Sequence, residues 1–177
     1  RINDFISSQM QTQKLKNEKY PQFFFPEIQP FIKPPKKDKK KGEDNWITEF
    51  SSKLPDNFYE NRKKGENESI ICGLIREDLI EDFITYVQHE DYPLNSTIPL
   101  SNYETHPFLL KKEKITLIEY VVFYGSNQIF KYLFKNGVKL SPSLWEYAIH
   151  SNNQETIHLL EENSIKAISY SGLFNEA

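Results

Sequence analysis

Residues 116–138 read Thr-Leu-Ile-Glu-Tyr-Val-Val-Phe-Tyr-Gly-Ser-Asn-Gln-Ile-Phe-Lys-Tyr-Leu-Phe-Lys-Asn-Gly-Val, and this stretch decides the fold. Its two apolar segments, 116–124 and 126–136, are each the length of a short helix, and a glycine separates them. Helices this short are unstable alone, so we expect them to be held by neighbouring helices. Two further segments of the same kind follow at 143–151 and 153–162.

The stretch recurs along the chain. A shift of 27 residues places Leu117 on Leu144, Glu119-Tyr120 on Glu146-Tyr147, Leu133 on Leu160 and Asn136 on Asn163. A third copy begins 29 residues later, at Leu173. Stacked helix pairs bury a face that one pair cannot bury alone, which predicts an all-α helical-repeat solenoid over residues 65–177, with about three helix pairs and a truncated last copy.

An earlier helix pair is indicated by apolar residues over 70–75 and 80–87. It fits the repeat with a shift of 49 residues, which leaves an insertion of 22 residues relative to the later copies. The polar, proline-containing stretch 93–114 has this length, and we predict that it forms a long loop. The acidic residues Glu77, Asp78, Glu81 and Asp82 lack the spacing of a calcium loop and are interpreted as a solvated helix face.

Residues 1–64 differ from the rest in composition, and we treat them as a separate N-terminal part. We predict a helix over 2–19 and an extended strap of prolines and aromatics over 20–35. The rings of Tyr20, Phe23, Phe24, Phe25 and Phe31 are expected to be mostly buried. A Lys-rich loop over 36–42 follows, and then a helix over 44–54 whose Trp46 would cap the open end of the solenoid.

Charge divides the chain in the same place. Residues 1–64 hold 14 Lys/Arg and 9 Asp/Glu, whereas residues 65–177 hold 8 Lys/Arg and 16 Asp/Glu, so the balances are +5 and −8. The most concentrated charge is made by Lys36, Lys37, Lys39, Lys40 and Lys41. Such a cluster is typical of a nuclear-import signal, of a segment that binds a phosphate backbone or an acidic protein surface, or of a loop that only adds solubility. The acidic repeats argue against nucleic acid because they would repel phosphate.

The sequence contains no motif typical of a catalytic, cofactor-binding or metal-binding site. No His-x-x-x-His pair or phosphate-binding glycine loop occurs, so we predict no catalytic, cofactor-binding or metal-binding residues. The single cysteine, Cys72, is interpreted as a small core residue. No apolar run is long enough to cross a membrane, and the composition favours an intracellular location, cytoplasmic or cytoskeletal.

The quoted stretch resembles an ankyrin repeat. The likeness rests on 116–122, Gly125, 128–130, 132–134 and Gly137-Val138, although Leu117 stands where that family usually has proline and Glu119 where it has histidine. The amino-acid sequence of 57–62, 81–84 and 143–145 resembles that of a large protist family of divergent ankyrin-type proteins, which is expanded in trichomonad parasites. Those proteins usually continue further at both ends, so we expect this chain, which begins at Arg1, to be a piece of a longer protein.

The resemblance implies a non-enzymatic protein–protein interaction module. Partners of ankyrin-type repeats usually meet exposed positions late in each first helix, which correspond here to Phe123, Tyr124, His150 and Ser151. The alternative at this point is that Phe123 and Tyr124 pack on the insertion. Two other functions stay open: a structural subunit of a larger, cytoskeletal assembly, and a nucleic-acid-associated factor that uses the Lys-rich loop. The sequence identifies neither the protein partner nor the oligomeric state.

Overall fold

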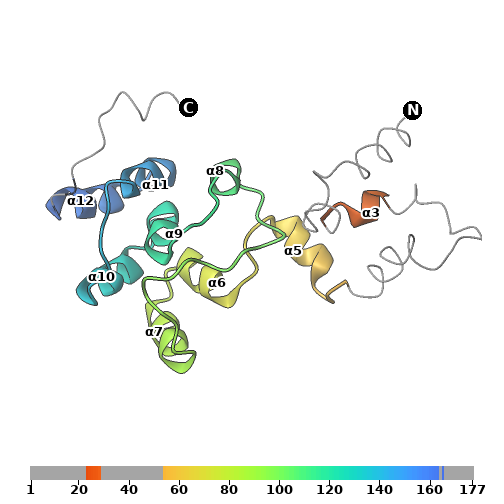
Figure 1. Ribbon diagram of the computed structural model, residues 1–177, viewed down its shortest axis with the longest axis horizontal. Coiled ribbons are helices and arrows are strands. Elements are labelled where there is room, and N and C mark those ends of the chain that lie inside the picture. The colour runs from red at the N-terminus through yellow and green to blue at the C-terminus, as the bar shows by residue number, and fades with distance from the viewer. Residues whose placement is uncertain (1–22, 29–53, 164, 166–177) are drawn as a thin grey trace, which may run out of the picture. The chain divides into compact units, whose positions relative to one another are not determined.

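The computed structural model describes residues 23–28, 54–163 and 165 of the 177-residue chain (Figure 1). These residues form α-helices and no named strand, which confirms the predicted all-α class for the part that is described. They divide into two compact units, one of 23–28, 54–66 and 101–105 and one of 67–100, 106–163 and 165. The predicted helix over 2–19, the Lys-rich loop, the Trp46 helix and the copy at Leu173 lie outside the described residues.

The first unit contains α3 (Phe25–Ile28) and α5 (Phe58–Lys64). Phe25 and Phe58 are buried, and the Phe58 ring packs edge-on against Tyr103 with centroids 5.8 Å apart. The prediction of an extended strap is therefore wrong for 25–28. Pro26 is compatible with this helix because it lies in the first turn, where its missing N–H costs no hydrogen bond. Of the strap rings described, Phe25 is buried as expected but Phe24 is 45% exposed.

Helix α5 ends at a glycine that the fold requires. Gly65 has φ +68°, and its N–H bonds back to the carbonyl of Asn61. Its own carbonyl accepts from the Thr105 N–H at 3.0 Å and from the Thr105 hydroxyl at 2.8 Å. A Cβ at position 65 would lie 2.5 Å from that hydroxyl, so both the left-handed backbone and the close contact exclude a side chain here.

The second unit is built from helices that contact one another in pairs. Its elements are α6 (Ile70–Arg76), α7 (Ile80–His89), α8 (Pro107–Leu110), α9 (Leu117–Tyr124), α10 (Asn127–Lys135), α11 (Leu144–Ser151) and α12 (Gln154–Glu162). Helix α6 packs on α7, α9 on α10, and α11 on α12. Helix α9 also contacts α6 and α11, and α10 contacts α7, so the first helices of the pairs form one row beside the second helices (Figure 1).

The four predicted helices from 116 onward each start one residue later than expected, because each predicted range included the N-cap. Thr116 has extended backbone and accepts from the Glu119 N–H, while a Glu119 carboxylate oxygen accepts from the Thr116 N–H at 2.8 Å. This reciprocal arrangement is a capping box. The other Glu119 oxygen lies 3.4 Å from the hydroxyl of Ser143, which precedes α11. Glu119 thus caps its own helix and contacts the start of the next pair.

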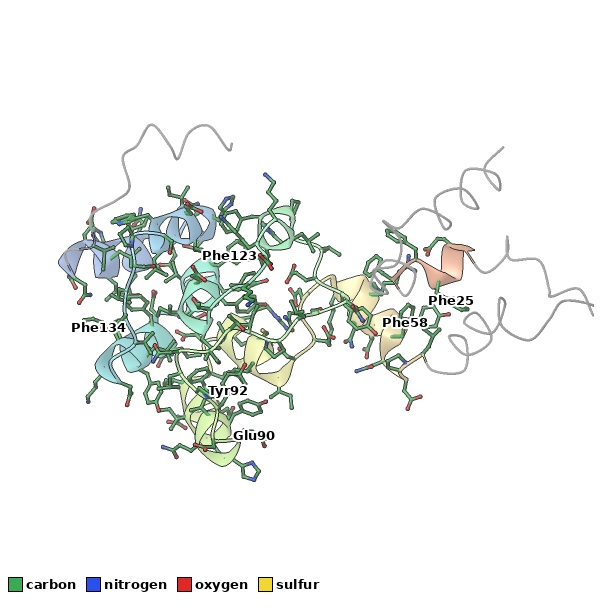
Figure 2. All side chains as sticks on the ribbon, viewed as in Figure 1. Phe25, Phe58, Glu90, Tyr92, Phe123 and Phe134 are labelled. Carbon is green, nitrogen blue, oxygen red and sulfur yellow. The ribbon has the colours of Figure 1, made fainter. Side chains whose placement is uncertain are left out.

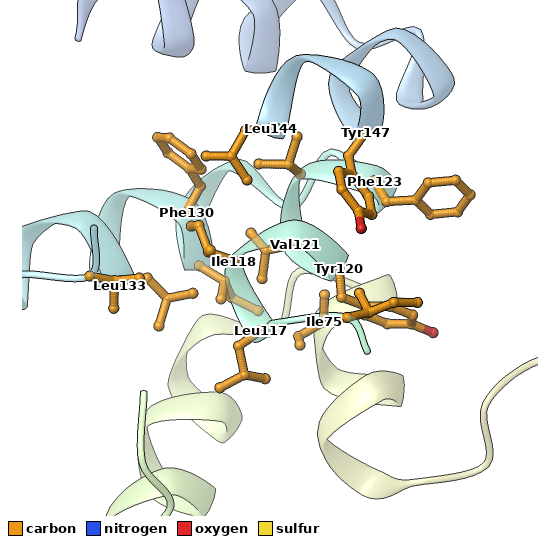
Figure 3. Close-up of a cluster of buried hydrophobic side chains, with 14 of the residues drawn as sticks. Ile75, Leu117, Ile118, Tyr120, Val121, Phe123, Phe130, Leu133, Leu144 and Tyr147 are labelled. Atoms are coloured by element: carbon orange, nitrogen blue, oxygen red, sulfur yellow. The ribbon is translucent and has the colours of Figure 1, made fainter. Parts of the chain in front are cut away.

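The core is centred on α9, which is apolar on all sides. Its buried side chains are Leu117, Ile118, Tyr120, Val121, Val122 and Phe123. Figure 3 shows this helix among Ile75 of α6, Leu133 of α10 and Leu144 of α11. A helix without a polar face needs neighbours all round, and α6, α10 and α11 supply them. Cys72 is fully buried in the same core, as predicted.

The insertion over 93–114 is more ordered than a loop. It contains α8, and a bridge pairs Thr97 with Thr116 antiparallel just before α9 begins. The Ile98 N–H donates to the Ile115 carbonyl at 2.8 Å. The buried Asn67 side chain also donates to the Pro99 carbonyl at 2.7 Å. The prediction of a long loop is therefore wrong in part, because backbone pairing and a helix fix both ends of this segment.

Neighbouring helix pairs are joined by polar contacts to the start of the second helix. Asp78, between α6 and α7, has φ +52°, and its two carboxylate oxygens accept from the Gln128 and Ile129 N–H groups at 3.0 Å each. These are otherwise unsatisfied donors at the start of α10. One pair later, the Asn127 side chain accepts from the Thr156 hydroxyl at 2.9 Å near the start of α12. Each pair therefore contributes a side chain to the next.

We predict that Asp78→Gly destabilises the protein by about 1–2 kcal/mol, because it removes both acceptors at the start of α10. Glycine tolerates the positive φ at this position, so backbone strain does not contribute. Asp91→Gly is the matched control, since Asp91 has a similar φ of +49° and an exposed side chain. Urea unfolding followed by circular dichroism measures both changes. An equal effect of the two variants would show that the Asp78 contacts are not stabilising.

Candidate functional site

The residues predicted to meet a partner lie at the C-terminal ends of α9 and α11, and they differ in exposure. Phe123 is only 8% exposed, Tyr124 and Ser151 are half-buried, and His150 is exposed. The lysines predicted at 36, 37, 39, 40 and 41 lie outside the described residues. The structure thus brings together the ends of two first helices, but it does not present Phe123 on the surface.

Phe123 is covered by the insertion. Its ring stacks on Phe108 of α8 with centroids 5.7 Å apart and planes 3° apart. His106, which precedes α8, packs edge-on against the same ring at 4.8 Å. The Tyr124 ring packs against Tyr120 at 4.7 Å and Phe123 at 5.0 Å. Phe123 is therefore a core residue that packs on the insertion, as the alternative for Phe123 and Tyr124 expected, whereas these Tyr124 contacts are with residues of α9.

Phe108 is the centre of this cluster, because it touches both first helices. Besides Phe123, its ring lies 5.1 Å from Tyr147 and 3.9 Å from His150, both on α11. The Lys112 ammonium is 4.9 Å from the Phe108 centroid, a cation–π distance, and 2.7 Å from a Glu146 carboxylate oxygen. Helix α8 is thus held on α9 and α11 by one aromatic ring with a paired cation beside it.

Two histidines that are far apart in sequence meet at α8. His106 is the N-cap of this helix, and its Nδ1 accepts from the Phe108 N–H at 3.3 Å. The His106 and His150 rings are 6.3 Å apart. Burial lowers the pKa of His150, and the neighbouring His106, Lys112 and Lys111 lower it further. The surroundings of His150 therefore favour its neutral imidazole.

Two tyrosine hydroxyls near the site are kept protonated. Burial is the main cause of a raised pKa at Tyr147, with smaller contributions from Glu119 and Glu146. Burial also raises the pKa of Tyr120, whose oxygen accepts from the Arg76 guanidinium at 3.0 Å. Both phenols therefore act as neutral packing and hydrogen-bonding groups, because the charged form would be poorly solvated.

Sequence reasoning missed α8, although signals for it were present. Pro107 stands at the first helical position, where proline is favoured, and His106 precedes it as a side chain that can cap. The outer surface of this helix carries Leu110, which is 45% exposed, and the exposed Lys111. We use the name α8 surface for the exposed residues Leu110, Lys111 and His150, of which Lys111 lies close enough to His150 to lower its pKa.

The described residues contain no group of three or more His, Cys, Asp or Glu side chains that could hold a metal ion. Among the same residues, every helix is too short or too polar to cross a bilayer. Comparisons with protein-family models, curated proteins and solved structures find no match to this chain.

We predict that Phe123→Ala lowers the free energy of unfolding by about 3–5 kcal/mol, because it opens a cavity beneath Phe108. Phe134→Ala is the control. The Phe134 side chain lies on α10 and is 45% exposed, so the expected loss is below about 1 kcal/mol (Figure 2). Chemical denaturation of both variants measures the difference. A folded Phe123→Ala protein with unchanged stability would mean that this ring is not part of the core.

Proposed function

We propose that this chain is a protein-binding module built on ankyrin-like helix pairs, and that its partner meets the α8 surface. The observation that carries the proposal is the exposed apolar and cationic face of α8, held over the ends of two first helices. The proposal assigns no reaction to the chain.

Features at related repeat positions support the ankyrin-like interpretation. Asp78 and Asn127 are related by the shift of 49 residues, and both bind near the start of the next second helix. Gly125 and Asn152 are related by the shift of 27, and both have left-handed backbone, with φ of +67° and +49°. Asparagine is among the residues that adopt this conformation most readily. Repeated sequence thus coincides with repeated geometry.

Buried polar groups support a role in binding rather than catalysis. Three buried polar residues among those described serve the fold: the Asn67 side chain donates to the Pro99 carbonyl in the insertion, the Ser126 hydroxyl donates to the Ile75 carbonyl, and the Thr156 hydroxyl donates to Asn127. Such groups are engaged in joining helix pairs. We therefore infer that the chain's contacts with other molecules are made by its exposed side chains.

The chemistry of the α8 surface indicates the kind of partner. Leu110 offers apolar area, while Lys111 offers a positive charge beside the ring of His150. The Lys111 charge is positive, whereas residues 65–177 carry a balance of −8. The complementary partner is a protein segment with an apolar side chain next to carboxylates. An apolar anchor flanked by charge is a common form of interface hot spot.

The test compares the wild-type chain with a double variant, Leu110→Ser with Lys111→Gln, as bait in a lysate of the source cells. Captured proteins are cross-linked and quantified by mass spectrometry, and the affinity of the main partner is then measured with purified components. We expect the double variant to bind about 10-fold to 100-fold more weakly, as loss of one anchor and one charge would give.

Phe134→Ser is the matched control, because Phe134 has the same 45% exposure as Leu110 but belongs to α10. It should bind like the wild type. Equal binding by all three proteins would exclude the α8 surface as the interface. Cross-links to other elements would then show which surface is used.

A further inference from the structure

The last described helix pair, α11 and α12, leaves apolar side chains in contact with solvent. Trp145 and Ile149 lie four residues apart on α11, so they share one face of that helix. Ile149 is 53% exposed and Trp145 is half-buried. Ile157 of α12 is half-buried as well. We use the name α11–α12 face for Trp145, Ile149 and Ile157.

In the preceding pair, the side chains at the same repeat positions are buried. The shift of 27 residues relates the α11–α12 face to Ile118, Val122 and Phe130. These three are 6%, 0% and 1% exposed. The contrast is largest between Val122 and its counterpart Ile149. Among the described residues, burial at these positions therefore ends with the last pair.

Helix α11 covers the earlier face. Tyr120 of α9 accepts a hydrogen bond from Arg76 of α6 at 3.0 Å. Ile118 and Val122 are each two residues from Tyr120, so they lie on the side of α9 away from α6. Figure 3 shows Leu144, the first residue of α11, on this side of α9, and its side chain is fully buried. The start of one first helix thus docks on the pair before it.

The chain leaves α12 in the same way as it leaves α10. The side chains of Asn136 and Asn163 each donate to the carbonyl four residues earlier, at 2.8 and 2.6 Å. The N–H groups of Val138 and Ile165 each donate to the carbonyl five residues earlier, at 3.1 and 3.2 Å. After α10 this turn leads to α11. After α12 it brings the Ile165 carbonyl to the α11–α12 face, where it accepts from the Trp145 indole N–H at 2.9 Å.

Residues 173–177, outside the described part of the chain, carry the sequence of a further first helix. They read Leu-Phe-Asn-Glu-Ala and match residues 144–148, with the leucine and the alanine identical and Phe174 at the position of Trp145. The shift is 29 residues instead of 27, so the connector before Leu173 is two residues longer than the one before Leu144. This length is sufficient for an equivalent docking.

We propose that the α11–α12 face binds residues 173–177 of the same chain, with Leu173 seated on α11 and α12 as Leu144 is seated on α9 and α10. The driving force is the removal of apolar area from water, above all at Ile149. The inference is independent of the α8 surface and of any partner, because all of its groups belong to this chain.

Photo-cross-linking of the full chain tests this proposal. Ile149 is replaced by p-benzoylphenylalanine, and trypsin releases 167–177 as a separate peptide because Lys166 is the last basic residue. Mixing ¹⁵N-labelled with unlabelled protein distinguishes links within one chain from links between chains. We expect irradiation to join position 149 to residues 173–177 of the same chain. The absence of this link, or a link only between two chains, would overturn the proposal.

Two charged variants test the register of docking. Leu173→Asp should lower the yield of the link about 10-fold, because a carboxylate at the seated position is costly to bury. Phe174→Asp is the matched control. Position 174 corresponds to Trp145, which lies on the side of its helix away from the preceding pair, so this variant should cross-link like the wild-type segment. Equal yields from the two variants would contradict the proposed seating.

A second attachment point controls for random encounters. Ile70 of α6 is 65% exposed, and it lies at the opposite end of the row of first helices from α11. With p-benzoylphenylalanine at position 70, residues 173–177 should give no link above background. A yield equal to that from position 149 would show that the segment has no fixed docking surface, which would also overturn the proposal.

Discussion

The apolar surface of α9 must be kept from water on every side, and the second unit is arranged around that requirement. Six of the eight residues of α9 are buried, so the helix has no face to leave in solvent. Helix α10 covers one side, and α6 and α11 cover the sides that lead to the neighbouring pairs. The insertion then covers the end of the helix, where the Phe108 ring lies on Phe123. Burying each such side chain contributes about 1.5–3 kcal/mol to the free energy of folding. This contribution exceeds the stability that helices of this length gain from their own hydrogen bonds.

The regular helices could be predicted because their signals are local. Apolar spacing predicted the helices from 116 to 162, and the bounds differed only at the four N-cap residues and at Asn136, which is the C-cap of α10. The helices α3 and α5 did not follow from the sequence in the same way, since α3 is a single turn and α5 buries only Phe58. The proline-rich composition around Pro26 suggested an extended chain, although proline in a first helical turn is permitted. Short helices of this kind depend on tertiary packing, which a local pattern does not contain.

The site was predictable in position but not in exposure. The repeat placed Phe123 and His150 at the ends of neighbouring first helices, and the structure has them there. Whether Phe123 faces solvent depends on Phe108, which lies in an insertion of irregular sequence. Likewise, the departure of Glu119 from the ankyrin pattern left its role open, and the structure shows it in a capping box. Contacts between distant segments decide both questions.

The contacts made by Asp78 and Asn127 run in one direction, from one helix pair to the next along the chain. Each of these side chains belongs to one helix pair but binds near the start of the second helix in the following pair. Shortening the protein from its C-terminal side, by removing α11 and α12, leaves the Asp78 carboxylate on the first N–H groups of α10. Shortening it from the N-terminal side strips a cap from the pair that is newly first. Loss of α6 and α7 would therefore leave the first N–H groups of α10 without the acceptors that Asp78 supplies, whereas loss of α11 and α12 would keep them.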